Sequence, residues 1–125
     1  MTDNYQILFQ LEAKCEKELK KNRIKIEEDV EKIIKWSVIF YESGIEPHIQ
    51  KLVPEIQERL HFETTLYIIK LGRAKRALVT IDVDEIFDQL IITMWAYTTT
   101  HDYQKIFRSL GESMYQKYLN QEVGE

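Results

Sequence analysis

The segment QLIITMWAYTTTH, residues 89–101, contains no Lys, Arg, Asp or Glu, although these four residue types make up 30% of the chain. A helix that is apolar on every side is one that is buried on every side. We therefore expect a central helix here, enclosed by other helices, a partner subunit or a bound ligand. Thr93, Trp95 and Tyr97 carry polar groups that need hydrogen-bond partners away from water. Two interpretations follow: a plain core helix at an oligomer interface, or one wall of a small-molecule pocket.

Helical spacing extends outward from this segment in both directions. The chain has only four Gly and two Pro, and apolar residues recur between them at steps of three and four. Gly44 is the expected C-terminal cap of one helix, and Asp82 with Glu85 has the spacing of a capping box for the uncharged helix. The predicted helices cover roughly residues 5–19, 27–43, 47–52, 54–79, 83–98 and 103–118. The spacing thus predicts an all-α bundle of about six helices.

The length and charge of the chain limit the classes of protein to which it can belong. With 125 residues and a net charge of −4, it has the size of one domain, residues 1–125, with a polar tail over 119–125. The acidic balance makes nucleic acid an unexpected partner, because binding phosphates requires clustered Lys and Arg. The one dense basic patch comprises Lys70, Arg73, Lys75 and Arg76.

Cysteine usage and the apolar runs indicate the compartment. Cys15 is the only cysteine, so no internal disulfide can form and a reducing compartment is expected; its role is left open. The N-terminus lacks a signal-peptide pattern, and no apolar run approaches the roughly 20 residues that span a bilayer. The sequence therefore predicts a cytoplasmic protein without a membrane span.

Catalytic and metal-binding motifs are missing from the sequence. There is no glycine-rich phosphate loop, no HExxH helix, no nucleophile elbow and no EF-hand loop, so no enzymatic activity is predicted. His61 and His101 lie where a globin-like chain would place haem ligands. His101, however, falls at a helix boundary beside Asp102, and the only further metal ligands on the face of His61 are Glu58 or Thr65. Neither haem nor a metal is expected.

Arg73 and Arg76 lie on the long predicted helix, on a face that turns partly inward. A partly buried Arg must be paired, and Asp82, Asp84 and Glu85 are the nearby structural partners. The alternative is that one of these guanidinium groups binds a ligand carboxylate or an inorganic anion such as chloride.

The segment LGRAKRALVTID, residues 71–82, followed by DEIF at 84–87, resembles part of a known family. It is similar to the haem-free, globin-like sensor domains at the N-termini of stressosome proteins, and to free-standing sporulation-inhibitory sensor proteins. The resemblance covers the layout of roughly residues 55–119. It implies a globin-like fold without haem, a fatty-acid tunnel with an anion-holding chamber, and a role in which the protein keeps its signal away from a signalling kinase pathway. Because nothing after Leu119 could form an output domain, a free-standing sensor is expected.

The sequence and the resemblance together predict a non-enzymatic sensor that holds a small apolar ligand, such as a fatty acid, and regulates sporulation or a stress response by sequestration. The predicted ligand-binding residues are His61, Thr65, Arg73, Thr93 and Tyr97. In a plain core, the Thr93 hydroxyl would instead bond back to the Gln89 or Leu90 carbonyl. The alternative functions are a small helical subunit of a nucleoprotein or phage complex, and a haem globin that senses a gas.

A homodimer is also expected, because the last predicted helix has more apolar and aromatic side chains than one face can bury in a small core. These are Tyr103, Ile106, Phe107, Leu110, Met114, Tyr115 and Tyr118.

Overall fold

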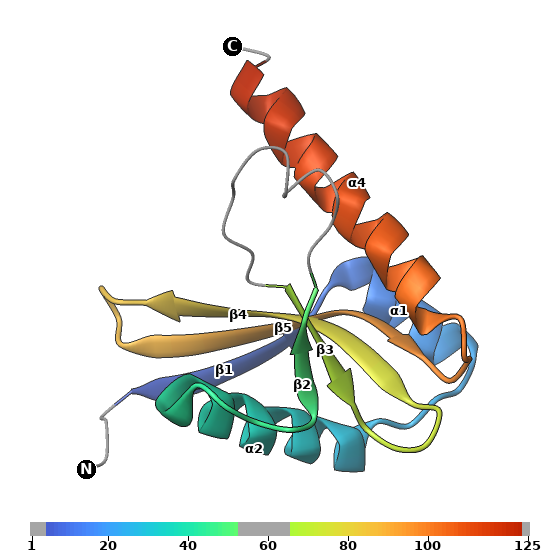
Figure 1. Cartoon of the computed structure of the whole chain (residues 1–125), viewed down its shortest axis with the longest axis horizontal. Helices are drawn as coiled ribbons and strands as arrows, with labels where there is room; N and C mark the ends of the chain where they lie inside the picture. The colour runs from blue at the N-terminus through green and yellow to red at the C-terminus, as the bar shows by residue number, and fades with distance from the viewer. Residues whose placement is uncertain (1–4, 53–65, 124–125) are drawn as a thin grey trace.

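The computed structural model describes residues 5–52 and 66–123 and shows a mixed α/β fold (Figure 1). The predicted all-α, globin-like bundle of six helices is therefore wrong. Within the described ranges, three helices accompany one five-stranded sheet. In chain order, the elements are β1 Gln6–Leu11, α1 Ala13–Lys21, α2 Glu27–Ser43, β2 Ile49–Lys51, β3 Leu66–Lys70, β4 Arg76–Asp84, β5 Gln89–Thr98 and α4 Tyr103–Val123.

The strands lie in the order β1-β5-β4-β3-β2. β2, β3, β4 and β5 are successive antiparallel neighbours, whereas β1 pairs with β5 in parallel. Two parallel strands cannot be joined by a tight turn, and α1 and α2 lie in the long connection that follows β1. Because β5 pairs with β1 on one side and with β4 on the other, it is an interior strand.

The uncharged segment forms β5. A strand that is buried on both faces lacks charge along its whole length, just as a buried helix does, so the missing charges are compatible with either structure. Leu90, Ile92 and Met94 are buried on one face of β5, and Thr93 is only 7% exposed on the other. The Asp82–Glu85 capping box does not form. Instead, the carboxylate of Asp84 accepts hydrogen bonds from the backbone N–H groups that follow it and closes the β4–β5 turn.

Two of the predicted helices are confirmed. α2 spans Glu27–Ser43 as expected, and Gly44 ends it with a left-handed φ of 80°. α4 takes the place of the last predicted helix. Strands also replace predicted helical residues at 6–11, 49–51 and 66–70, and β4 replaces the end of one predicted helix and the start of the next, at 76–79 and 83–84. Residues 54–65 of the helix predicted at 54–79 lie outside the described residues.

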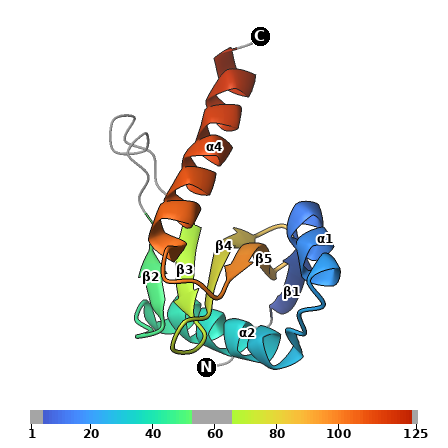
Figure 2. The same cartoon turned by 90° about the vertical axis from the view of Figure 1, so that its right-hand side faces the viewer.

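α2 covers one face of the sheet and α4 rises from the other (Figures 1 and 2). On the α2 face, Ile33 is fully buried against side chains of the three central strands. On the α4 face, Phe107 is fully buried against Leu66, Ile68 and Leu78. The sheet thus separates two apolar clusters, one under each helix.

Within the described ranges, no helix has the combination of length and apolar character that crossing a membrane requires.

Candidate functional site

A groove of about 480 Å³ lies between α1 and α4. Figure 2 shows these two helices on either side of β5, the strand whose C-terminal part forms the floor. The floor residues are Trp95 and Ala96. The α1 side is lined by Glu12, Lys14, Cys15 and Glu18, and the α4 side by Ile106, Leu110, Ser113 and Met114.

A β-bulge places both floor residues on the same side of the sheet. Val79 pairs with Met94 and Leu78 pairs with Ala96, so Trp95 is an extra residue on β5. Without the bulge, Trp95 and Ala96 would point to opposite faces, because side chains alternate along a strand. The indole N–H of Trp95 donates to the hydroxyl of Thr80 at 2.9 Å. This bond fixes the ring as a flat apolar surface with its polar atom already satisfied.

The α1 wall is fixed by the residue that begins the helix. The Glu12 carboxylate caps α1 by accepting from the backbone N–H groups of Lys14 and Cys15, at 3.0 and 3.1 Å. The backbone N–H of Glu12 donates to the Met94 carbonyl at 3.0 Å, which ties the start of α1 to β5. Glu12 therefore serves as a structural cap, and its carboxylate is already occupied.

Cys15 brings a thiol to this wall, and it is only 4% exposed. Burial, together with the nearby carboxylates of Glu12 and Glu18, raises the pKa of the thiol to about 11. The neutral thiol is a small apolar group and a poor nucleophile, since thiolate is the reactive form. In this groove Cys15 contributes apolar surface.

The α4 wall is held by residues of its first two turns. Phe107 is fully buried, and the guanidinium of Arg76 lies 4.7 Å from the centre of the Tyr103 ring. Ile106 is 46% exposed and lines the groove. α4 is thus anchored along one face while its next face stays available to the groove.

The groove combines an apolar floor and wall with a polar rim, which is the usual character of a ligand pocket. The polar groups of the groove are the Lys14 ammonium, the Glu18 carboxylate and the Ser113 hydroxyl, together with the Glu12 carboxylate that caps α1. Among the described residues, no group of three or more His, Cys, Asp or Glu side chains could hold a metal ion.

The predicted site residues do not come together. His61 and Thr65 lie outside the described residues. Thr93 accepts from the Gln10 amide at 2.9 Å on the α4 face. The bond back to the Gln89 or Leu90 carbonyl, expected for a plain core helix, does not form because this segment is a strand. Tyr97 lies on the other face, where its hydroxyl donates to Asp29 at 3.0 Å. Arg73 is exposed in the β3–β4 turn, and none of these three lines the groove.

The alternative function as a nucleoprotein subunit depends on the basic patch at residues 70–76. Two cations of this patch are held by contacts within the chain. The Lys75 ammonium lies 3.4 Å from the buried carboxylate of Asp29. The Arg76 guanidinium donates to the Gly72 carbonyl at 2.9 Å and also covers the Tyr103 ring. Two of the four cations therefore stabilise the β3–β4 turn and its junction with α4.

Sequence reasoning missed the two helix walls. The sequence places Ile106, Leu110 and Met114 on a predicted dimer surface, and it indicates no role for Cys15. The signal was present in the apolar stripe of the last helix. It could not be read as a groove wall, because nothing in the sequence shows which strand the stripe approaches.

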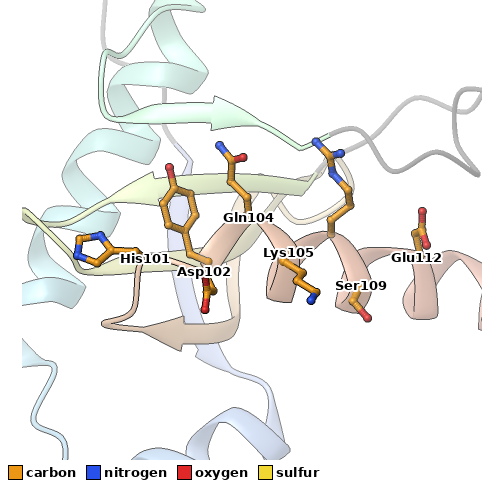
Figure 3. Close-up of a pocket in the computed structure, with 8 residues that line it drawn as sticks. His101, Asp102, Gln104, Lys105, Ser109 and Glu112 are labelled. Atoms are coloured by element: carbon orange, nitrogen blue, oxygen red, sulfur yellow. The ribbon is translucent and has the colours of Figure 1, made fainter.

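A second hollow, of about 750 Å³, follows the first turns of α4 (Figure 3). Its lining residues come from one stretch of chain: His101, Asp102, Tyr103, Gln104, Lys105, Arg108, Ser109 and Glu112. Figure 3 shows Lys105 and Ser109 pointing away from Gln104 and Glu112. Since these polar groups do not converge on one point, the α1–α4 groove remains the candidate site.

Comparisons of the chain with protein-family profiles, with curated proteins and with solved structures found no match. They give no information about the resemblance to globin-like sensor domains. The helical layout on which that resemblance depended is replaced by a sheet over residues 66–98.

Proposed function

We propose that this chain is a non-enzymatic binding protein that holds a small apolar ligand, of the fatty-acid class, in the groove between α1 and α4. The observation that carries the proposal is the floor of the groove, where the bulge in β5 brings Trp95 and Ala96 to one side. The groove volume of about 480 Å³ falls within the range of roughly 300–1,000 Å³ found for ligand pockets.

The polar rim supports a ligand with one anionic end. An acyl chain would lie on Trp95 and against Ile106, while Lys14 at the rim would face the carboxylate. An ammonium at the edge of an apolar groove keeps its hydration and still attracts an anion.

Native mass spectrometry of protein purified from cells tests this proposal. We expect an added lipid mass on the parent protein and a higher unfolding temperature when palmitate is added. Ile106→Glu should remove both effects, because it places a carboxylate against the acyl chain. Ile39→Glu is the matched control, since Ile39 is 39% exposed on α2 and does not line the groove.

A second variant examines the rim. Lys14→Met should weaken binding of palmitate severalfold and leave binding of the corresponding fatty alcohol unchanged, because only the acid carries a charge. If the parent protein carries no lipid and is not stabilised by either compound, the proposal is wrong.

The predicted homodimer is a separate matter and stays a prediction. Tyr103, Phe107, Leu110 and Met114 pack within their own chain, which leaves Ile106 as the exposed large apolar residue of the described α4 side chains. Light scattering that gives the monomer mass of 15.0 kDa would contradict the dimer.

A further inference from the structure

The end of the sheet that carries the β4–β5 turn has an exposed apolar surface. Ile86 is 85% exposed and Phe87 is 70% exposed, at the tip of the turn. Val83 and Ile7 are 49% and 43% exposed on the adjoining strands. Register places Ile7 and Val83 on either side of Leu90, which is itself buried. We call these four exposed residues the turn-end patch. This end is at the left of Figure 1, away from α1.

The turn holds its apolar pair outward in a fixed conformation. The Asp84 carboxylate accepts from the backbone N–H groups of Ile86 and Phe87, at 3.0 and 3.3 Å. Asp88 has a positive φ of 51° and closes the turn, and its carbonyl accepts from the Gln6 N–H at 2.8 Å. An exposed apolar group that is already ordered loses little conformational entropy on binding.

The surroundings of the patch are acidic. A hollow of about 360 Å³ beside the tip is lined by Asp84, Glu85 and Asp88, with Tyr5 and Tyr41. α2 also directs its C-terminal end, the negative end of the helix dipole, toward this side. The Lys and Arg residues of the β3–β4 turn lie at the opposite end of β4. Carboxylates and aromatic rings around one hollow favour a cationic side chain.

We propose that the turn-end patch docks a partner protein that presents a basic side chain next to an apolar socket. The cation would enter the hollow beside Glu85 and Asp88, and the socket would receive Ile86 and Phe87. A second copy of the chain fits poorly, because two acidic ends would repel each other. An anionic lipid surface is disfavoured for the same reason. This docking site is separate from the α1–α4 groove and does not depend on it.

The test uses the full chain and a synthetic peptide of alternating Leu and Arg as the probe. Backbone amide NMR should show shifts over residues 5–8 and 82–91. Phe87→Ser should weaken binding at least about tenfold. Glu85→Gln combined with Asp88→Asn should weaken it severalfold and reduce its salt dependence; Asn tolerates the positive φ at position 88. Ile39→Ser, at an exposed position on α2 that lines neither the hollow nor the groove, is the matched control and should bind like the parent.

Two control peptides separate charge from apolar contact. A Ser/Arg peptide and a Leu/Glu peptide should each bind at least about tenfold more weakly than the Leu/Arg peptide. The proposal is overturned if the Leu/Arg peptide does not bind, if Ser/Arg binds equally well, or if Phe87→Ser has no effect. The proposal is also overturned if the parent protein binds phosphatidylserine vesicles and Phe87→Ser abolishes that binding, because the occupant is then a membrane. It is likewise overturned if the parent protein dimerises and Phe87→Ser abolishes the dimer, because the occupant is then a second copy.

Discussion

The two faces of the sheet are covered in different ways. On the α2 face, a helix of 17 residues lies along the strands and buries Asp29, Ile33 and Ser37. On the α4 face, Phe107 anchors the start of α4, and the helix then rises away from the sheet (Figure 2). The first arrangement makes a closed core, whereas the second leaves a groove beside α1. One sheet thus combines a stabilising face with a face that can bind.

The largest expected effect concerns the anchor of the open face. Phe107→Ala should lower the free energy of unfolding by about 3–5 kcal/mol, since a fully buried aromatic ring is lost. Urea unfolding measures the change, and Ile106→Ala, one residue earlier and half exposed, should cost less than about 1 kcal/mol. Equal effects of the two substitutions would show that α4 is not docked through Phe107.

The buried carboxylate of the closed face should give the next largest effect. Asp29 is 3% exposed and accepts from the Tyr97 hydroxyl, with the Lys75 ammonium 3.4 Å away. Asp29→Ala should destabilise by about 1–3 kcal/mol, because the Tyr97 hydroxyl loses its acceptor. Lys75 adds little, since it is half exposed and can turn to water. Tyr97→Phe is the comparison and should cost about 1 kcal/mol. A neutral Asp29→Ala would mean that the closed core does not depend on this pair.

Alkaline pH probes two buried groups, the Cys15 thiol on the α1 wall of the groove and the Tyr97 hydroxyl on the α2 face. Burial raises the pKa of Cys15 from 9.0 to about 11, and burial with the Asp29 hydrogen bond raises that of Tyr97 from 10.0 to about 12. A raised folded-state pKa means that the folded protein keeps its proton longer, so stability falls as pH rises. Cys15 should act between about pH 9 and 11 and Tyr97 between about pH 10 and 12.

Denaturant unfolding across this pH range checks both contributions. Cys15→Ala should flatten the lower part of the decline, and Tyr97→Phe the upper part. If neither variant changes the slope, the burial of these two groups does not control the alkaline loss of stability.

The smallest expected effect is a gain in stability. The Ser37 hydroxyl is fully buried on the α2 face and has no hydrogen-bond partner among the described residues. Ser37→Ala removes that unsatisfied group and should stabilise the protein by up to about 1 kcal/mol, as measured by thermal unfolding. A loss of stability would show that the hydroxyl has a role in the closed core.

The difference between the two faces also explains what the sequence could predict. α2 was predicted with its cap because it has one buried side and one charged side, and Gly44 permits the left-handed turn. β5 was mistaken for a helix because a doubly buried strand has no alternation of apolar and polar residues. Its Leu90-Ile91-Ile92-Thr93 run, rich in β-branched residues, was the available sign of a strand.

The groove could not be predicted because it depends on contacts between distant residues. The bulge at Trp95 arises from its pairing with β4, and the α1 wall depends on the bond from Glu12 to Met94. Thr93 and Tyr97 were correctly singled out as polar groups that need partners. Their partners, Gln10 and Asp29, are protein side chains on opposite faces.

Fluorescence of Trp95 tests most directly whether the open face holds an apolar ligand. The chain has two Trp residues, so Trp36→Phe leaves Trp95 as the single reporter at the floor of the groove. Titration with palmitate should change the Trp95 emission in a saturable way. When Ile106→Glu is combined with Trp36→Phe the change should disappear, and when Ile39→Glu is combined with Trp36→Phe it should persist. An emission that does not respond to palmitate, or responds equally in both variants, would contradict the account.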